Sequence, residues 1–338
     1  VEEEIKISFD LQHQKSIFSF GTSFNLNKKD TPNIFLKINH INVNNLLKVW
    51  PKDFKESVYS WMSDNSKGLI DNFVINLDFS NLNNNLSLEN IDGGFDFKDT
   101  EIKYMDSMPS IIMINGKAKI FSDKIIFYVD NGSSQKLKLV DGYVSLYDLD
   151  TDSEKADIKL RIISENKDAV EYLDTSPIDK KNFTKLRKIK GEADIDLNLN
   201  FPLLLDLKAE EIEYESKVNI YNASINNLFY KISLEKLTLS LLVNNDEVEY
   251  SGDALVKESV INFNGKQYIY DNLVRDEISG NINLIAESIE EISQGIFSKS
   301  FGSIPIDFKY SSDDKDLIKV EAIGTLDNFA SKSEFLGD

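Results

Sequence analysis

Regular alternation of apolar and polar residues is the feature that most limits what this chain can fold into. Between Gly191 and Phe201 every second residue is apolar, and the residues between them are acidic or amide side chains. Because successive side chains of a β-strand point to opposite faces, this pattern predicts a strand with one apolar face and one wet face. The apolar residues of this stretch are Ala193, Ile195, Leu197, Leu199 and Phe201.

The alternation recurs along the chain, at a spacing of roughly ten residues that is typical of all-β proteins. Turn signals such as Asn131-Gly132 and Asn264-Gly265 separate the runs, and short connections make neighbouring strands antiparallel. The sequence therefore predicts a mostly β fold, built as a long, twisted and largely antiparallel sheet. Two further apolar rows are formed by Ile125, Phe127 and Val129 and by Leu237, Leu239 and Leu241.

Only a few short segments have the periodicity of a helix. Phe54, Val58 and Trp61 fall on one helical face, and Pro51 suits the first turn of a helix. These residues predict a helix over 51–65.

Two other short helices are predicted, over 165–173 and over 288–294. Helices this short cannot cover the apolar faces of more than a dozen strands. An apolar face must nevertheless be buried. The sequence leaves two arrangements open: a sandwich of two sheets packed face to face, and an open groove lined by apolar side chains.

The composition excludes several classes of partner and site. The chain carries 57 acidic and 38 basic side chains, and its net charge of -19 repels phosphates, so we expect no nucleic acid partner. It has no cysteine, which excludes disulfides and thiolate metal sites. With His13 and His40 as the only histidines, a histidine-rich metal site is excluded too, and we predict neither a metal nor a cofactor.

Motifs that carry catalysis are also missing. The sequence contains no glycine-rich phosphate loop and no nucleophile elbow. Residues 148–152 begin like a calcium-binding loop, but Ser153 replaces the required glycine and Lys159 stands where a bidentate glutamate belongs. Acidic pairs such as Asp194 and Asp196 fall on the wet face of a strand. We therefore predict no catalytic residue.

A series of short motifs lies between residues 45 and 255. Trp50-Pro51 is followed by Trp61 and Gly68. The segments that follow are Ile91 to Phe95, Ile102 to Tyr104 with Met108-Pro109, Ile114 to Ala118, Lys190 to Ala193, and Phe201 to Leu203. The order of these motifs resembles that of AsmA-like bacterial proteins of the YhdP and TamB type.

The resemblance implies a fold and a function. Sheets of these proteins curl into a long half-pipe, shaped like a taco shell, with an apolar inner face. We therefore expect residues 1–338 to form one elongated β-groove segment in which phospholipid acyl chains slide between the inner and the outer membrane. The three apolar rows named above are expected to line the groove. The helix at its edge is expected to present Trp50, Pro51, Phe54, Val58 and Trp61.

The resemblance also implies a location and partners. We expect a periplasmic chain anchored to the inner membrane by a segment outside this sequence, since no apolar run here approaches the roughly 18 residues that span a bilayer. Phospholipids are the expected ligands. Proteins of the inner and outer membranes are the expected partners at the ends of the full-length chain.

Two other functions compete with this interpretation. A structural or adhesive β-rich scaffold would have the same strands, but its apolar faces would form a closed core without a ligand. A glycan hydrolase would need carboxylates converging beside an aromatic platform. The only tryptophans, Trp50 and Trp61, lie close together in the sequence and away from any convincing acidic pair.

Overall fold

The computed structural model describes residues 4–13, 15–25, 32–49, 56–82, 85–176, 186–204, 207–229, 232–270, 273–293, 296–312 and 318–333. The chain divides into two compact units. Unit 1 contains residues 1–162 and 198–212, and unit 2 contains residues 163–197 and 213–338. The predicted single elongated segment concerns the relation between these units, and it stays a prediction.

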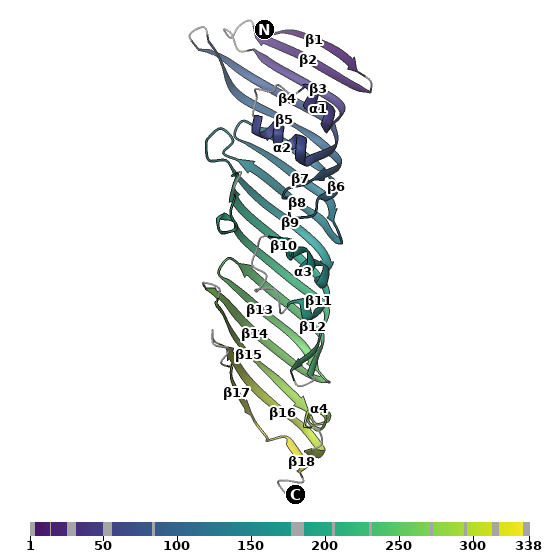
Figure 1. The fold of residues 1–338 in the computed structure, drawn as a ribbon, viewed down its shortest axis with the longest axis vertical. Helices are drawn as coiled ribbons and strands as arrows, with labels where there is room; N and C mark the ends of the chain where they lie inside the picture. Colours follow the sequence, from purple (N-terminus) through teal and green to yellow (C-terminus); the bar gives the residue numbers. More distant parts are fainter. Residues whose placement is uncertain are drawn as a thin grey trace. The chain divides into compact units, whose positions relative to one another are not determined.

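Unit 1 is a meander in which the strands follow one another in chain order (Figure 1). Each strand from β1 to β7 is hydrogen-bonded in antiparallel orientation to the next strand along the chain. The strands are β1 (Glu4–His13), β2 (Ser16–Asn25), β3 (Asn33–Asn42), β4 (Ser66–Leu82), β5 (Asn85–Ile102), β6 (Ile111–Phe121), β7 (Lys124–Ser134), β8 (Leu137–Tyr147) and β9 (Lys155–Glu165).

Unit 2 repeats the same architecture. Its strands from β11 to β17 pair antiparallel in chain order, and β16 pairs with β18 as well through its first residues. The strands are β10 (Ile189–Pro202), β11 (Glu213–Phe229), β12 (Ile232–Asn244), β13 (Glu247–Val256), β14 (Ser259–Tyr270), β15 (Leu273–Ile285), β16 (Phe297–Ser312), β17 (Ile318–Gly324) and β18 (Phe329–Ser333). The predicted fold class, a largely antiparallel and twisted sheet with a few short helices, is confirmed.

The described helices are short. They are α1 (Val43–Val49), α2 (Glu56–Asn65), α3 (Asn166–Leu173) and α4 (Ala286–Ile292), with single 3-10 turns η2 (Leu186–Lys188) and η3 (Ala209–Glu211). α2 lies within the range predicted at 51–65, α3 matches 165–173, and α4 overlaps 288–294. A helix of 10 residues such as α2 is about 15 Å long, whereas a strand of 17 residues such as β4 extends about 56 Å. The helices therefore cover only part of each apolar face.

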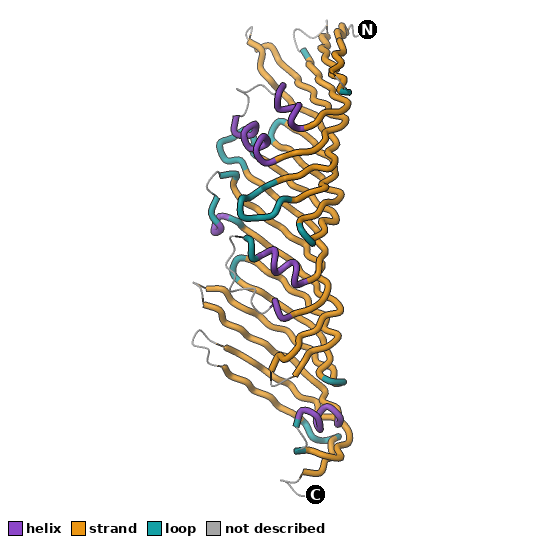
Figure 2. The backbone as a smooth tube through the Cα atoms, turned by 45° about the vertical axis from the view of Figure 1, so that its right-hand side comes forward, coloured by secondary structure: helices purple, strands orange, loops and turns teal. Residues whose placement is uncertain are grey.

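Helix α1 was not predicted from the sequence. Asn42 caps its start, because the side-chain oxygen of Asn42 accepts a hydrogen bond of 2.9 Å from the backbone N–H of Asn44. Val43, Leu46 and Leu47 are buried and pack with residues of β3 and β4. α1 and α2 thus lie against the apolar face of unit 1 (Figure 2).

Both units contain a series of β-bulges. At six of the register shifts, one residue other than glycine adopts a left-handed backbone conformation. A bulge bends its strand and increases the local right-handed twist of the sheet. The residues concerned are Asn72 of β4, Asp99 of β5, Met113 of β6, Asn222 of β11, Lys236 of β12 and Lys299 of β16.

The buried side chains gather where helices and bulged strand ends meet. In unit 1, one cluster joins α1 to β3 and β4, and a second contains Phe97, Ile114, Val129 and Leu139. In unit 2, the largest cluster spans β10 to β13 and includes Leu237, which is 0% exposed. Burial of each such side chain contributes about 1.5–3 kcal/mol relative to its exposed state.

The bulge at Lys236 allows a direct test of backbone strain. Lys236 is exposed and has φ of 48°. Lys236→Gly should be neutral or should stabilise the protein by up to about 1 kcal/mol, because glycine removes the steric conflict of the left-handed region. Lys236→Val should destabilise it by about 1–2 kcal/mol. Urea denaturation followed by circular dichroism measures both values.

Lys217 provides the matched control, since it is an exposed lysine at a regular pairing position of β11. There the order should reverse, with valine tolerated and glycine destabilising, because an extended strand favours β-branched residues. The same order of stabilities at both positions would contradict the strain assigned to the bulge.

Candidate functional site

The apolar face of unit 2 is continuous across its strands. Cross-strand pairing places apolar side chains, interrupted only by glycines, in rows that run perpendicular to the strands. One row is Leu241, Tyr250, Gly265, Ile278, Tyr310 and Val320, the next is Leu239, Gly252, Phe263, Gly280, Phe308 and Ala322, and a third is Ala254, Ile261, Ile282, Ile306 and Gly324.

The side chains of these rows become less buried from β12 toward β17. The apolar side chains of β12 are buried in the cluster around Leu237. Tyr250, Phe263 and Phe308 on the following strands are only half-buried, and Val320 on β17 is 64% exposed. The apolar face is therefore packed against protein at one end of unit 2 and accessible at the other.

Unit 1 has a comparable face with a concentration of aromatic rings. Phe73 stacks on Phe95 with ring centroids 6.0 Å apart, and Phe95 meets Phe127 edge to face at 6.2 Å. Phe95 and Phe127 come from β5 and β7, on either side of β6, where the small side chain of Ala118 pairs with both. Edge-to-face and stacked rings add specificity to the packing. The face stays half-buried at Phe73, Phe95 and Phe127.

The accessible surface area shows that the chain is covered less completely than a compact protein. The chain exposes 21479 Å². A compact monomer of this mass would expose about 14,000 Å², and two separate compact bodies of half the mass about 17,000 Å². The excess does not depend on how the two units are arranged. It is explained by sheets whose apolar faces lack a second layer.

The three predicted lining rows lie in different surroundings. On β10, Ala193 is buried, whereas Ile195, Leu197, Leu199 and Phe201 are half-buried. On β7, Val129 is buried and Ile125 and Phe127 are half-buried. The row on β12, Leu237, Leu239 and Leu241, is at most 6% exposed and contacts protein.

The accessible strands β13 to β17 were not among the predicted lining. Their half-buried aromatic residues, including Tyr250 and Phe308, lie on the same apolar face as the predicted residues of β12, but on strands that were not predicted to line it. The alternation of Ile304, Ile306 and Phe308 is the signal in the sequence that identifies this face.

The predicted helix at the groove edge is only partly described. Trp50, Pro51 and Phe54 lie outside the described residues. Val58 and Trp61 belong to α2, where the description covers their backbone. Two other side chains of α2, Tyr59 and Met62, pack against the cluster of α1, β3 and β4. The role predicted for the tryptophans stays a prediction.

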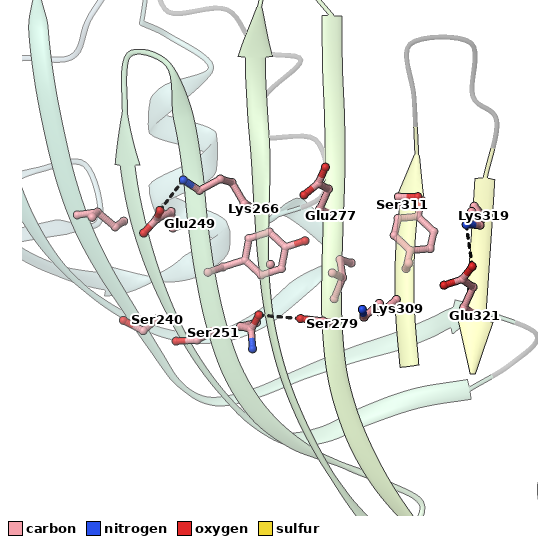
Figure 3. Close-up of a pocket in the computed structure, with 16 residues that line it drawn as sticks. Ser240, Glu249, Ser251, Lys266, Glu277, Ser279, Lys309, Ser311, Lys319 and Glu321 are labelled. Carbon is pink, nitrogen blue, oxygen red and sulfur yellow. Dashed lines mark hydrogen bonds and ion pairs between the residues drawn. The ribbon is translucent and has the colours of Figure 1, made fainter. Parts of the chain in front are cut away.

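The opposite face of unit 2 is polar. A wide depression of about 800 Å³ extends over β12 to β17 and is lined mainly by charged, serine and asparagine side chains (Figure 3). Lys266 donates to Glu249 at 2.7 Å and to Glu247 at 2.9 Å, and these contacts raise the pKa of Lys266. Lys319 and Glu321 form a further ion pair of 2.7 Å. Acid and base neutralise each other on this face, as on the solvated side of an ordinary sheet.

A hydrogen-bonded triad of polar side chains lies on the polar side of unit 1. Asp71 of β4 accepts a contact of 2.8 Å from Lys98 of β5 and one of 2.5 Å from Nδ1 of His40 on β3. Hydrogen bonding to Lys98, and then to His40, holds the pKa of Asp71 below its usual value. The side chain of Asp71 is only 17% exposed, so its interactions are less screened than those of surface pairs. This triad links three neighbouring strands.

Two kinds of feature are absent from the described residues. No three acidic or histidine side chains in that part of the chain gather closely enough to hold a metal ion. No described helix is long and apolar enough to cross a bilayer.

Comparison with known families gives one match. A family model described as YhdP protein matches residues 8–331. No curated protein and no solved structure gives a significant match to the chain. The matched range extends well beyond residues 45–255, on which the resemblance was first based.

The triad at Asp71 predicts a dependence of stability on acid pH. Because the pKa of Asp71 is lowered in the folded state, its contribution is complete above its usual value of 3.8 and is lost as the pH falls through the folded pKa. Wild-type protein should therefore lose free energy of unfolding below that value more steeply than Asp71→Asn. Chemical denaturation at a series of pH values between 7 and 2 measures the two slopes.

Asp106→Asn is the control for this experiment. Asp106 pairs with Lys103 at 2.6 Å, and this contact lowers its pKa, but its side chain is 97% exposed and the pair is screened by solvent. We expect Asp106→Asn to follow the wild-type curve closely. Parallel curves for wild type and Asp71→Asn would show that the triad contributes nothing.

Proposed function

The chain belongs to the YhdP protein family, and on that premise we propose that it is a lipid-transfer conduit. Phospholipid acyl chains bind along the apolar face of the sheet and are carried between the inner and the outer membrane. The observation that carries the proposal is the continuous apolar face on which Tyr250, Phe263 and Phe308 stay half-buried. A protein that needed this face only for its own core would cover it.

The physical basis of transfer is the hydrophobic effect. Each methylene that leaves water gains about 0.8 kcal/mol, so moving two acyl chains through water costs tens of kcal/mol. An apolar floor removes most of that cost. Because the hydrophobic effect is non-directional, a chain can slide from row to row without one fixed binding site. Polar headgroups remain in water at the open side of the sheet.

Location and partners follow from the same proposal. The conduit is periplasmic and held at the inner membrane by a segment outside these residues. Its ligands are phospholipids, and proteins of the two membranes bind the ends of the full-length chain. The net charge of -19 disfavours flat adsorption of these residues on an anionic membrane surface and suits a protein that works between membranes.

A structural scaffold is the second candidate, and one observation favours it. The cluster around Ile220, Leu237 and Leu241 is closed, and these three residues are at most 4% exposed. If all apolar rows were covered in this way, the chain would need no ligand. The half-buried rows of β13 to β16 and the exposed row of β17 distinguish the conduit from that alternative.

Lipid content is the first property to measure. The chain, purified from bacterial cells without detergent, should carry several phospholipids per molecule with no preference for one headgroup. Native mass spectrometry counts the bound lipids, and organic extraction identifies them. A stable, monodisperse protein without lipid would overturn the proposal and favour the scaffold.

A charge on the apolar face should stop transfer. Leu197→Asp places a carboxylate on the apolar side of β10, where it would need water that the passing acyl chain excludes. Transfer of fluorescent phospholipid between vesicles should fall to background. Asn198→Asp adds the same charge to the opposite side of the same strand and should leave transfer unchanged.

If Leu197→Asp does not fold, Val320→Asp tests the same assignment of the apolar face. Val320 lies on the exposed strand β17, so a carboxylate there is not buried in the folded protein. It interrupts the row that contains Tyr310 and should reduce transfer as well. Normal transfer by folded Leu197→Asp and Val320→Asp proteins would refute the assignment of this face.

A further inference from the structure

Half-buried aromatic residues on the apolar face of unit 2 sit opposite glycines. Tyr250 of β13 pairs with Gly265 of β14, and Phe263 of β14 pairs with Gly252 of β13. Phe308 of β16 pairs with Gly280 of β15 in the same way. In these pairs a large ring faces a residue without a side chain, and a glycine inside a strand often marks close approach of another group.

The rings lie over the glycines. A Cβ atom built on Gly265 would be 2.5 Å from Cζ of Tyr250, and one on Gly280 would be 2.7 Å from Cζ of Phe308. On Gly252 the corresponding distance to Cζ of Phe263 is 2.8 Å. Each ring therefore occupies the space that a side chain on the neighbouring strand would fill. It lies flat against the backbone instead of standing upright on the face.

The surroundings of Tyr250 agree with this geometry. Burial against the sheet raises the pKa of its hydroxyl, with smaller contributions from Asp276 and Tyr310. A phenol ring standing free above the floor would be better hydrated than this.

We propose that these aromatic–glycine pairs keep the apolar floor of unit 2 level for acyl chains, because the glycines let the rings lie flat against the backbone. The inference rests on the proposed function and adds to it the residues that set the size of chain admitted. Alanine in place of a paired glycine raises the ring above the floor and obstructs acyl chains with bulky ends. The rings themselves remain part of the apolar floor in either position.

Gly265 gives the cleanest test of the three glycines. The nearest atoms to its added Cβ all belong to the end of the Tyr250 side chain, which can move. At Gly252 and Gly280 the added Cβ would also come within 2.5 Å and 2.3 Å of a backbone carbonyl oxygen, so folding itself would suffer. Gly265→Ala therefore changes the position of one ring with the least disturbance of the sheet.

Gly21 supplies a matched control. It pairs with Phe35, whose ring lies over it as in unit 2, but this pair is on the polar side of unit 1, away from Phe20 and Leu36. Gly21→Ala disturbs the same kind of aromatic–glycine pair without changing the apolar face, although its added Cβ would also come within 2.9 Å of the backbone oxygen of Ile7.

The experiment compares two probe lipids of different width. The whole chain is incubated with vesicles containing a phospholipid with two straight saturated chains and one whose acyl chain ends in a pyrene group. Native mass spectrometry then gives the ratio of the two bound lipids. Gly265→Ala should lower the bound share of the pyrene lipid roughly tenfold, as a modest overpacking penalty implies. Gly265→Ala/Tyr250→Leu should restore the ratio, and Gly21→Ala should keep it.

If Gly265→Ala does not fold, Ala322→Phe is a second variant that tests the same inference. Ala322 lies on the exposed strand β17 opposite Phe308, not opposite a glycine, so a new ring there has to stand upright and should exclude the pyrene lipid too.

Different failures have different meanings. Wild-type protein that binds neither probe would refute the proposed function. Wild-type protein that binds both probes, with an unchanged ratio in folded Gly265→Ala and Ala322→Phe proteins, would refute only the inference about the level floor. A ratio that Tyr250→Leu fails to restore would show that the ring is not the cause.

Discussion

The antiparallel hydrogen-bonded ladder is the constraint on which the rest of this structure depends. It fixes which side chains stand beside one another and forces alternate residues onto opposite faces. Once Leu239 pairs with Gly252, and Gly252 with Phe263, an entire row of the apolar face is determined. The same ladder places Glu249 beside Lys266 on the other side. Two surfaces of opposite character therefore arise from one pattern of backbone bonds.

Local departures from regular pairing adapt this two-faced sheet. Bulges at Asn72 and Lys236 accommodate an extra residue and curl the strand, and the residues that follow them return to the same faces. Small residues then allow long-range contacts across a strand, as Ala118 does between Phe95 and Phe127. The bending of strands and the packing of aromatic rings thus depend on a few bulges and small residues that interrupt the regular apolar–polar alternation.

The two faces also divide the energetic roles. Buried rows such as that of Leu237 stabilise the fold, whereas half-buried rows such as that of Phe263 leave apolar surface in contact with solvent. Leaving such a surface exposed is unfavourable unless a ligand covers it, since large apolar patches usually mark binding surfaces. Paired charges such as Lys98 with Asp71 keep the other side hydrated and link neighbouring strands. In the proposed function, binding and stability therefore depend on different rows of the sheet.

The sequence by itself determined that the chain forms strands with two unlike faces, and it determined the helix at 165–173, because these depend on the period of apolar residues within one segment. It also indicated the family through the order of short motifs. It did not determine where strands end, since the turns predicted at Asn131-Gly132 and Asn264-Gly265 lie inside β7 and β14. Only the tertiary structure decided which rows are covered, since burial of Leu237 and exposure of Val320 depend on residues distant in the sequence. The partners of Gly265 and Gly280 were likewise beyond the sequence, because one residue of register shift changes every cross-strand neighbour.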